Sequence, residues 1–189
     1  MSLQYSDAKV EVIDNVKMMS PPAFSNHNRV KDNVFSIFKG YLRNNVCVPV
    51  GDGQKVVLPS QKRGNYVVPD FFVFCDRSKY KADGLHGSPD LVVEVLSPKT
   101  AKLDRGRKKD LYQQNDVKEY WIIEPDKKEI EVYLLKDGVY DLDNIYRISD
   151  PETDDDPEGA VMSFSVSTFP DLVVNLEEIF EYVNLWEQQ

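Results

Sequence analysis

The chain has 189 residues, of which 41% are hydrophobic and 29% charged, so its composition predicts one folded domain and excludes a collagen-like or wholly disordered polymer. The formal net charge of −9 argues at first against nucleic acid as a partner, because phosphate binding draws on clustered lysines and arginines. No apolar run approaches the roughly 18 residues that cross a bilayer, and the N-terminus lacks the basic-then-apolar order of a secretory signal, so we expect a cytoplasmic protein that does not contact membranes.

The N-terminal half is predicted to hold a hairpin, a long helix and several strands. Apolar residues alternate loosely between residues 7 and 20 around a turn at Asp14, which indicates an N-terminal hairpin within residues 1–24. From residue 25 to residue 44 apolar residues recur at helical spacing, with Ser25 or Asn26 as a possible N-cap. Three apolar segments that follow are expected to be strands, at residues 46–50, 55–58 and 67–74.

The second half predicts a mixed sheet. A β-branched strand at residues 90–96, a helix at 100–114 and a strand at 119–124 imply a parallel crossover, and the next strand at 129–134 implies an antiparallel hairpin. We therefore expect an α/β fold with a mixed sheet flanked by helices. The remaining predicted elements are an acidic loop, a short strand and a terminal helix, at residues 150–159, 161–166 and 176–187.

The two cysteines, Cys47 and Cys75, lie far apart in the sequence. Their number and spacing support neither a disulfide scaffold nor a zinc site. We therefore expect both to be thiols in the core.

The charges are unevenly distributed. Six acidic residues fall within the stretch 150–158, which we expect to be solvated, and removing them leaves a nearly balanced chain. Within eleven residues there is also a basic cluster that includes only one acid, Asp104; its members are Lys99, Lys102, Arg105, Arg107, Lys108 and Lys109. Such a run is commonly a solvated helix face, and it is also a possible surface for nucleic acid.

Several separated motifs agree in order and spacing with a known family. They are Pro69–Asp70, Ser88–Pro98, Asp104–Lys108, Tyr112 and Glu119–Ile122. Over residues 12–180 the chain resembles the putative restriction endonuclease family known as domain of unknown function 820, which lies within the PD-(D/E)XK nuclease superfamily. This resemblance implies a single restriction-endonuclease-like domain across residues 1–189 and a magnesium-dependent phosphodiesterase site.

Two acids are the best candidates for the metal site. If residues 70–75 and 90–96 pair antiparallel, Asp70 at the start of one strand should approach Glu94 near the end of the other. Asp90 lies about 13 Å from Glu94 along its strand, too far to share an ion, so we keep it only as a possible accessory residue. Glu94 stands within an apolar strand, where a buried carboxylate is costly without a cation.

The basic member of the site is expected on the following helix. The superfamily pattern places a lysine two residues after the second acid, but Leu96 occupies that position here. The resembling family implies that the lysine has moved to the helix, where Lys108 matches it. Asp104 and Lys108 stand one helical turn apart, and Asp104 is a possible accessory acid. His27, at the start of the first helix, either orients metal-bound water or contacts phosphate, or it is only a capping or solvated residue.

The resulting hypothesis is an endonuclease that hydrolyses DNA. Asp70, Glu94 and the carbonyl of Val95 are expected to hold Mg²⁺, and Lys108 to orient the attacking water. The phosphate contacts are expected from the other members of the basic cluster, which are Lys99, Lys102, Arg105, Arg107 and Lys109. A homodimer is expected by analogy with enzymes that cut both strands. A catalytically inactive module of the same fold, which binds nucleic acid or protein, stays open as the alternative, and a glycosidase is a remote third.

Overall fold

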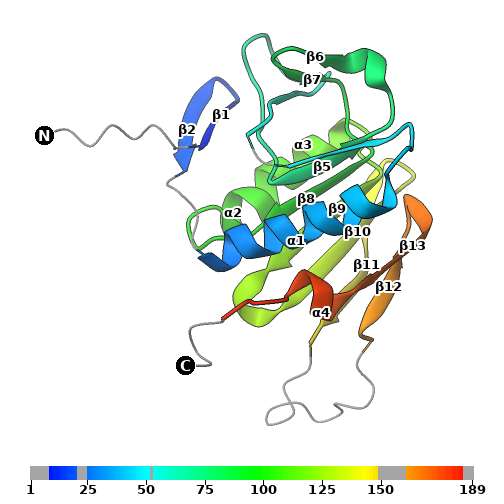
Figure 1. Ribbon diagram of the computed structural model, residues 1–189. Helices are drawn as coiled ribbons and strands as arrows, with labels where there is room; N and C mark the ends of the chain where they lie inside the picture. The colour runs from blue at the N-terminus through cyan, green and yellow to red at the C-terminus, as the bar shows by residue number, and fades with distance from the viewer. Residues whose placement is uncertain (1–8, 21–24, 52, 149–160, 185–189) are drawn as a thin grey trace, which may run out of the picture.

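The computed structural model describes residues 9–20, 25–51, 53–148 and 161–184. Its centre is a six-stranded sheet in the order β11-β10-β9-β8-β5-β3 (Figure 1). Strands β8 and β9 pair in parallel and the other neighbours pair antiparallel, which confirms the predicted mixed sheet. The strands of this sheet are β3 (Val48–Val50), β5 (Phe71–Phe74), β8 (Leu91–Val95), β9 (Glu119–Glu124), β10 (Glu129–Lys136) and β11 (Val139–Arg147).

Helices cover both faces of the sheet (Figure 1). The long helix α1 (Ser25–Tyr41) packs its apolar side on one face of the sheet. Three residues after its end, Asn44 has a left-handed backbone conformation (φ 65°), which a right-handed helix cannot include. On the other face lies the crossover segment, a short α2 (Ala101–Leu103), a π-helical stretch η2 (Asp104–Lys108) and α3 (Lys109–Gln114). The predicted helix at 100–114 is therefore present, with a π-helical middle.

Side-chain alternation along the central strands divides the core into two. On β8, Val93 packs under α1, whereas Val92 faces the crossover segment. All five residues of β8 are buried, as its apolar composition predicts. Glu94 shares the side of Val92, so its carboxylate points toward the crossover segment and away from α1.

Smaller elements surround the sheet. The N-terminal hairpin consists of β1 (Lys9–Ile13) and β2 (Val16–Ser20), which confirms the prediction for that part of residues 1–24 that the structure describes. A three-stranded sheet and a second hairpin lie further along, together with short helices; these are β4 (Val56–Val57), β6 (Tyr80–Lys81), β7 (Gly84–His86), β12 (Ser163–Val166), β13 (Phe169–Asn175), η1 (Arg77–Lys79), η3 (Pro125–Lys127) and α4 (Leu176–Ile179). Among the described residues, no helix is long and apolar enough to span a membrane.

The C-terminal region differs from the sequence prediction. The helix expected over 176–187 ends at Ile179, because Tyr182 and Asn184 both take a φ of 61°, which a right-handed helix excludes. Strands β11 and β13 were not among the predicted elements. The acidic loop at 150–159 lies outside the described residues.

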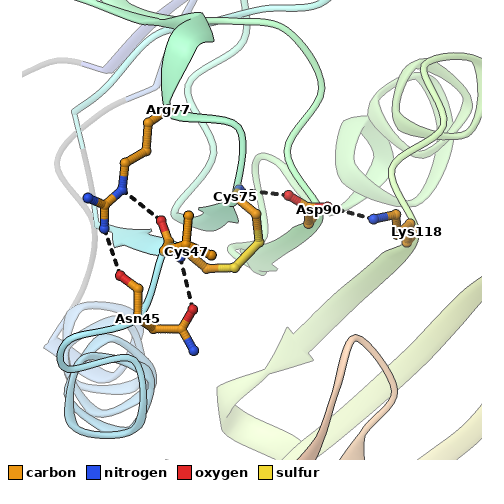
Figure 2. The surroundings of a disulfide bond; sticks show 7 residues. Asn45, Cys47, Cys75, Arg77, Asp90 and Lys118 are labelled. Atoms are coloured by element: carbon orange, nitrogen blue, oxygen red, sulfur yellow. Dashed lines mark hydrogen bonds and ion pairs between the residues drawn. A yellow bond between two sulfur atoms is a disulfide. The ribbon is translucent and has the colours of Figure 1, made fainter.

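The prediction of two free thiols is wrong. Cys47 and Cys75 form a disulfide (Figure 2). The register of β3 and β5 pairs Val48 with Phe74, so one further step places the two cysteines opposite each other. Sequence separation says nothing about such cross-strand pairing, which depends on the sheet register.

Candidate active site

The strand register brings the two predicted metal acids together. Phe71 pairs with Val93 in the antiparallel β5–β8 ladder, so the preceding Asp70 stands beside Glu94. The backbone amide of Val95 donates to Oδ2 of Asp70 at 2.9 Å, which fixes this carboxylate against the end of β8. Asp70 and Glu94 are 3% and 1% exposed, so both carboxylates are removed from bulk water and need cationic partners.

Lys108 supplies one of these partners. Its side chain is 1% exposed, and its ammonium lies 2.5 Å from Oε1 of Glu94 and 3.3 Å from Oδ1 of Asp104. Asp104 precedes it by four residues, and Tyr112 follows by four, with its hydroxyl donating to the same Glu94 oxygen at 2.6 Å. The sequence therefore predicted correctly that Asp104 and Lys108 lie on one side of the segment, although the backbone between them is π-helical.

The N-terminal hairpin contributes two residues that the sequence analysis did not assign to the site. The ammonium of Lys9 lies 2.8 Å from Oδ1 of Asp70 and 3.8 Å from Oε2 of Glu94. Glu11 is 3% exposed; its Oε1 accepts from the amide of Val68 at 2.7 Å and lies 3.3 Å from Nζ of Lys108. Lys9 and Glu11 are two residues apart on β1 and so project to the same side. Lys9 and Glu11 lie on the same side of β1 as the buried Ile13, and this alternation was the sequence signal that could have placed them in the interior.

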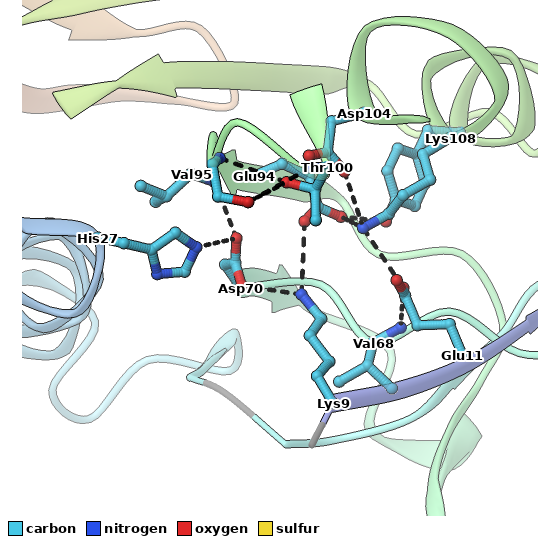
Figure 3. A network of polar contacts seen from close by, with 12 residues as sticks. Lys9, Glu11, His27, Val68, Asp70, Glu94, Val95, Thr100, Asp104 and Lys108 are labelled. Atoms are coloured by element: carbon cyan, nitrogen blue, oxygen red, sulfur yellow. Dashed lines mark hydrogen bonds and ion pairs between the residues drawn. The ribbon is translucent and has the colours of Figure 1, made fainter. Parts of the chain in front are cut away.

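His27, the predicted accessory residue, lies at the edge of this cluster. Its Nε2 is 3.3 Å from Oδ2 of Asp70. Its Nδ1 is buried and has no hydrogen-bond partner within the described part of the chain. The histidine therefore contacts the acid that the sequence analysis proposed as a metal ligand. Figure 3 shows Lys9, His27 and Lys108 approaching the two carboxylates from three separate segments.

The cluster perturbs its own ionisation. Burial disfavours the ionised form of Asp70, but Lys9, His27 and Lys108 outweigh burial and hold the pKa of Asp70 well below its usual range. For Glu94 burial wins, and its pKa rises to about 8 despite the two lysines. Burial opposes the charge of Lys108, yet the carboxylates around it raise its pKa well above the ordinary value. The surroundings thus shift the two carboxyl groups in opposite directions, lowering the pKa of Asp70 and raising that of Glu94.

The donor set fits a hard divalent cation. Oδ1 of Asp70 and Oε2 of Glu94 both contact the Lys9 ammonium, so they lie no further apart than the sum of those two distances, about 6.6 Å. Two oxygens bound to one Mg²⁺ lie at most about 4.2 Å apart, so at this upper limit the carboxylates would have to rotate toward each other to share an ion. No group of three His, Cys, Asp or Glu side chains within the described ranges is arranged to hold a metal. An ion here would therefore add backbone oxygen, such as the predicted Val95 carbonyl, and water to the two carboxylates, as Mg²⁺ commonly does.

The remaining predicted residues lie away from this cluster. Asp90, at the other end of β8, accepts from the amide of Cys75 at 2.8 Å and from Lys118 at 2.7 Å, so it holds the disulfide end of the sheet (Figure 2). It does not contribute to the carboxylate pair of Asp70 and Glu94.

The basic cluster is partly neutralised within the chain. Arg105 pairs with Glu124 and Glu131, and Arg107 makes two hydrogen bonds to Asp14. The Lys109 ammonium lies 3.6 Å from the centroid of the Tyr133 ring. Lys99 and Lys102 have exposed side chains, so these two are the members best placed to meet a phosphate backbone.

A cavity of about 390 Å³ reaches Asp70 from the side of α1. Its walls come from one side of α1, from Gly51 just after β3 and from Asp70; the lining residues are Asn28, Lys31, Asp32, Phe35, Gly51 and Asp70. The carboxylate cluster therefore has an opening that does not pass through the crossover segment.

Comparison with known proteins agrees with the resemblance seen in the sequence. A model of the Uma2 family, described as "Putative restriction endonuclease", matches residues 1–175. The chain belongs to the Uma2 family. This places it in a restriction-endonuclease-like nuclease family, and the matched segment includes every residue of the cluster in Figure 3.

Two individual proteins show how far the similarity extends. The uncharacterized protein slr1290 of Synechocystis sp. is 32% identical over 113 residues, which is 59% of this chain and 58% of that relative's length. A crystal structure of a putative nuclease of the DUF820 group from Anabaena variabilis superimposes with a TM-score of 0.71 at 16% identity, covering 96% of this chain and 94% of that one. The structural match confirms the fold that the sequence predicted.

Proposed function

We propose that this member of the Uma2 family is a Mg²⁺-dependent endonuclease that hydrolyses DNA phosphodiester bonds at the cluster of Asp70, Glu94 and Lys108. The observation that supports it most is that one cationic group, the Lys9 ammonium, already lies against both Asp70 and Glu94. Two buried carboxylates that converge on a single positive charge form the ligand arrangement that a divalent ion needs.

Bound Mg²⁺ would polarise a phosphate oxygen and lower the pKa of a coordinated water molecule. Asp70 is favoured in its ionised form by its cationic neighbours and is oriented by the Val95 amide, both of which suit it to coordinate a cation. Lys108 and Tyr112 both contact Oε1 of Glu94 and leave Oε2 on the side of Asp70, so this second oxygen would be available to hold a shared ion. Lys108 is thus a positioning residue for Glu94 and lowers the cost of burying its negative charge.

DNA is the proposed substrate, approached through the cavity at Asp70. Lys99 and Lys102, whose side chains are exposed, would contact the phosphate backbone, and these contacts carry no sequence information. A homodimer would place two sites on one duplex and stays a proposal by analogy.

A second candidate function keeps the fold without the reaction. The specific observation in its favour is that cations of the basic cluster are already paired with carboxylates of this chain. Lys108 contacts three carboxylates, and Arg105 and Arg107 are each paired with acidic residues. A nuclease-fold module that binds nucleic acid or protein would need no metal-competent pair of acids.

Plasmid nicking separates the two candidates. The wild type is expected to nick supercoiled DNA with Mg²⁺ and to lose this activity with EDTA, and Glu94→Gln is expected to lose at least about a hundredfold in rate, since it removes a ligand charge. Asp110→Asn, which changes an exposed acid on α3, is the matched control and should leave the rate unchanged. Absence of Mg²⁺-dependent nicking by the wild type supports the binding module, and unchanged nicking in Glu94→Gln refutes the site.

A further inference from the structure

The two lysines of the cluster divide the Glu94 carboxylate between them. Lys108 contacts Oε1, whereas Lys9 contacts Oε2 and also Oδ1 of Asp70. Lys108 is enclosed by three carboxylates at 1% exposure, while the Lys9 side chain is 20% exposed. Lys9 is therefore the cation that touches both proposed metal ligands, and it is the more accessible of the two lysines.

A divalent ion and this ammonium compete for the same oxygens. Mg²⁺ binds oxygen at about 2.0–2.1 Å, so an ion bridging Asp70 and Glu94 would lie within a few ångströms of Nζ of Lys9 as it stands. Like charges this close in a partly buried site repel each other strongly. We propose that the Lys9 ammonium fills the divalent-cation position in the resting protein and that Mg²⁺ binds by displacing it. The inference rests on the metal site of the proposed function and adds a residue to it.

The attachment of the N-terminal hairpin permits this exchange. Its turn is fixed to the body, because Arg107 binds Asp14 and the amide of Asn15 donates to Asn65. Further along β1, Val12 exchanges two backbone hydrogen bonds with Tyr66. Lys9 lies at the opposite end of β1 from the turn, and its ladder partner is Ser20 on β2. Glu11 also holds β1 to the body, through the Val68 amide and Lys108. The displacement therefore moves the Lys9 side chain and the end of β1 before Glu11, while the rest of the hairpin stays in place.

Mg²⁺ affinity, measured by titration calorimetry without DNA, tests the displacement. Lys9→Met keeps most of the side-chain volume and is expected to bind Mg²⁺ at least about tenfold more tightly than the wild type, since the competing charge is gone. Lys17→Met removes an exposed lysine of the same hairpin and should leave the affinity unchanged. Equal or weaker binding by folded Lys9→Met overturns the proposal. So does tight binding that persists in Glu94→Gln, because the ion would then lie elsewhere.

A measurement on the wild type keeps the test valid if Lys9→Met does not fold. Hydrogen exchange is compared with and without Mg²⁺, and the amides of β1 on the Lys9 side are expected to exchange faster when the ion is bound. The hairpin of β12 and β13, which does not contribute to the cluster, is the internal control. Unchanged exchange in β1 at saturating Mg²⁺ contradicts the displacement.

The two proposals fail separately. Tighter Mg²⁺ binding by Lys9→Met together with no DNA nicking by the wild type supports the displacement and refutes the nuclease. Mg²⁺-dependent nicking by the wild type, with no gain in Mg²⁺ affinity on removing Lys9, supports the nuclease and refutes the displacement.

Discussion

Replacing Lys108 by methionine tests whether the buried charge cluster is held together as the structure shows. The ammonium lies within 3.3 Å of carboxylate oxygens of Glu11, Glu94 and Asp104, and its side chain is 1% exposed. Methionine fills similar space, so the change removes the charge and leaves the carboxylates facing one another. Removing one partner from a buried ion pair typically costs about 3–5 kcal/mol.

The expected loss of unfolding free energy is large enough to measure in EDTA, by urea unfolding or as a lower Tm in thermal unfolding. For a domain of this size, each kcal/mol lowers Tm by about 2–4 °C, so Lys108→Met should unfold roughly 6–20 °C below the wild type. Lys102→Met, an exposed lysine on α2, should stay within about 0.5 kcal/mol of the wild type.

A double-mutant cycle then assigns part of the loss to one contact. Adding Glu11→Gln to Lys108→Met removes one of the uncompensated carboxylates, so the double variant should be more stable than the sum of the single losses predicts. A loss below about 1 kcal/mol for Lys108→Met alone would refute the reasoning, because a cation enclosed by carboxylates cannot be removed so cheaply.

Three further predictions follow from the same contacts. The pKa of Glu94 is raised from 4.5 to about 8, so the stability that its neutral form contributes is present below pH 4.5 and is lost as pH rises through about 8. Between these pH values the free energy of unfolding of Glu94→Gln, measured in EDTA, should rise relative to that of the wild type by up to about 1.4 kcal/mol per pH unit. A difference that does not change with pH would contradict the shift. Reduction of the disulfide between Cys47 and Cys75, which are 28 residues apart, should lower the free energy of unfolding by about 3 kcal/mol, whereas a variant with alanine at both positions should not respond to reductant. Lys102→Ala should reduce the salt dependence of DNA binding by about one unit of slope, whereas Arg105→Ala, whose cation is paired with acids of this chain, should change it less; equal effects would show that the pairing opens on binding DNA.

Local sequence patterns predicted the central architecture because its signals lie close together along the chain. The strand–helix–strand order after Asp90 predicted that β8 and β9 pair in parallel. The short connection between β9 and β10 predicted that these two strands pair antiparallel. Side-chain alternation and strand register then predicted that Asp70 approaches Glu94 and that Asp90 does not. The four-residue spacing from Asp104 to Lys108 likewise requires only one helical turn.

The rest depended on contacts between segments far apart in the chain. Cys47 and Cys75 meet through the register of an edge strand, and Arg105 and Arg107 are neutralised by acids from other elements. Lys9 and Glu11 reach the cluster because the N-terminal hairpin docks beside strands that lie about sixty residues later. Spacing and periodicity describe one segment at a time, so they showed which side chains share a side of a strand or helix. Which cation fills the space between the two carboxylates was set by the packing of the hairpin against the sheet.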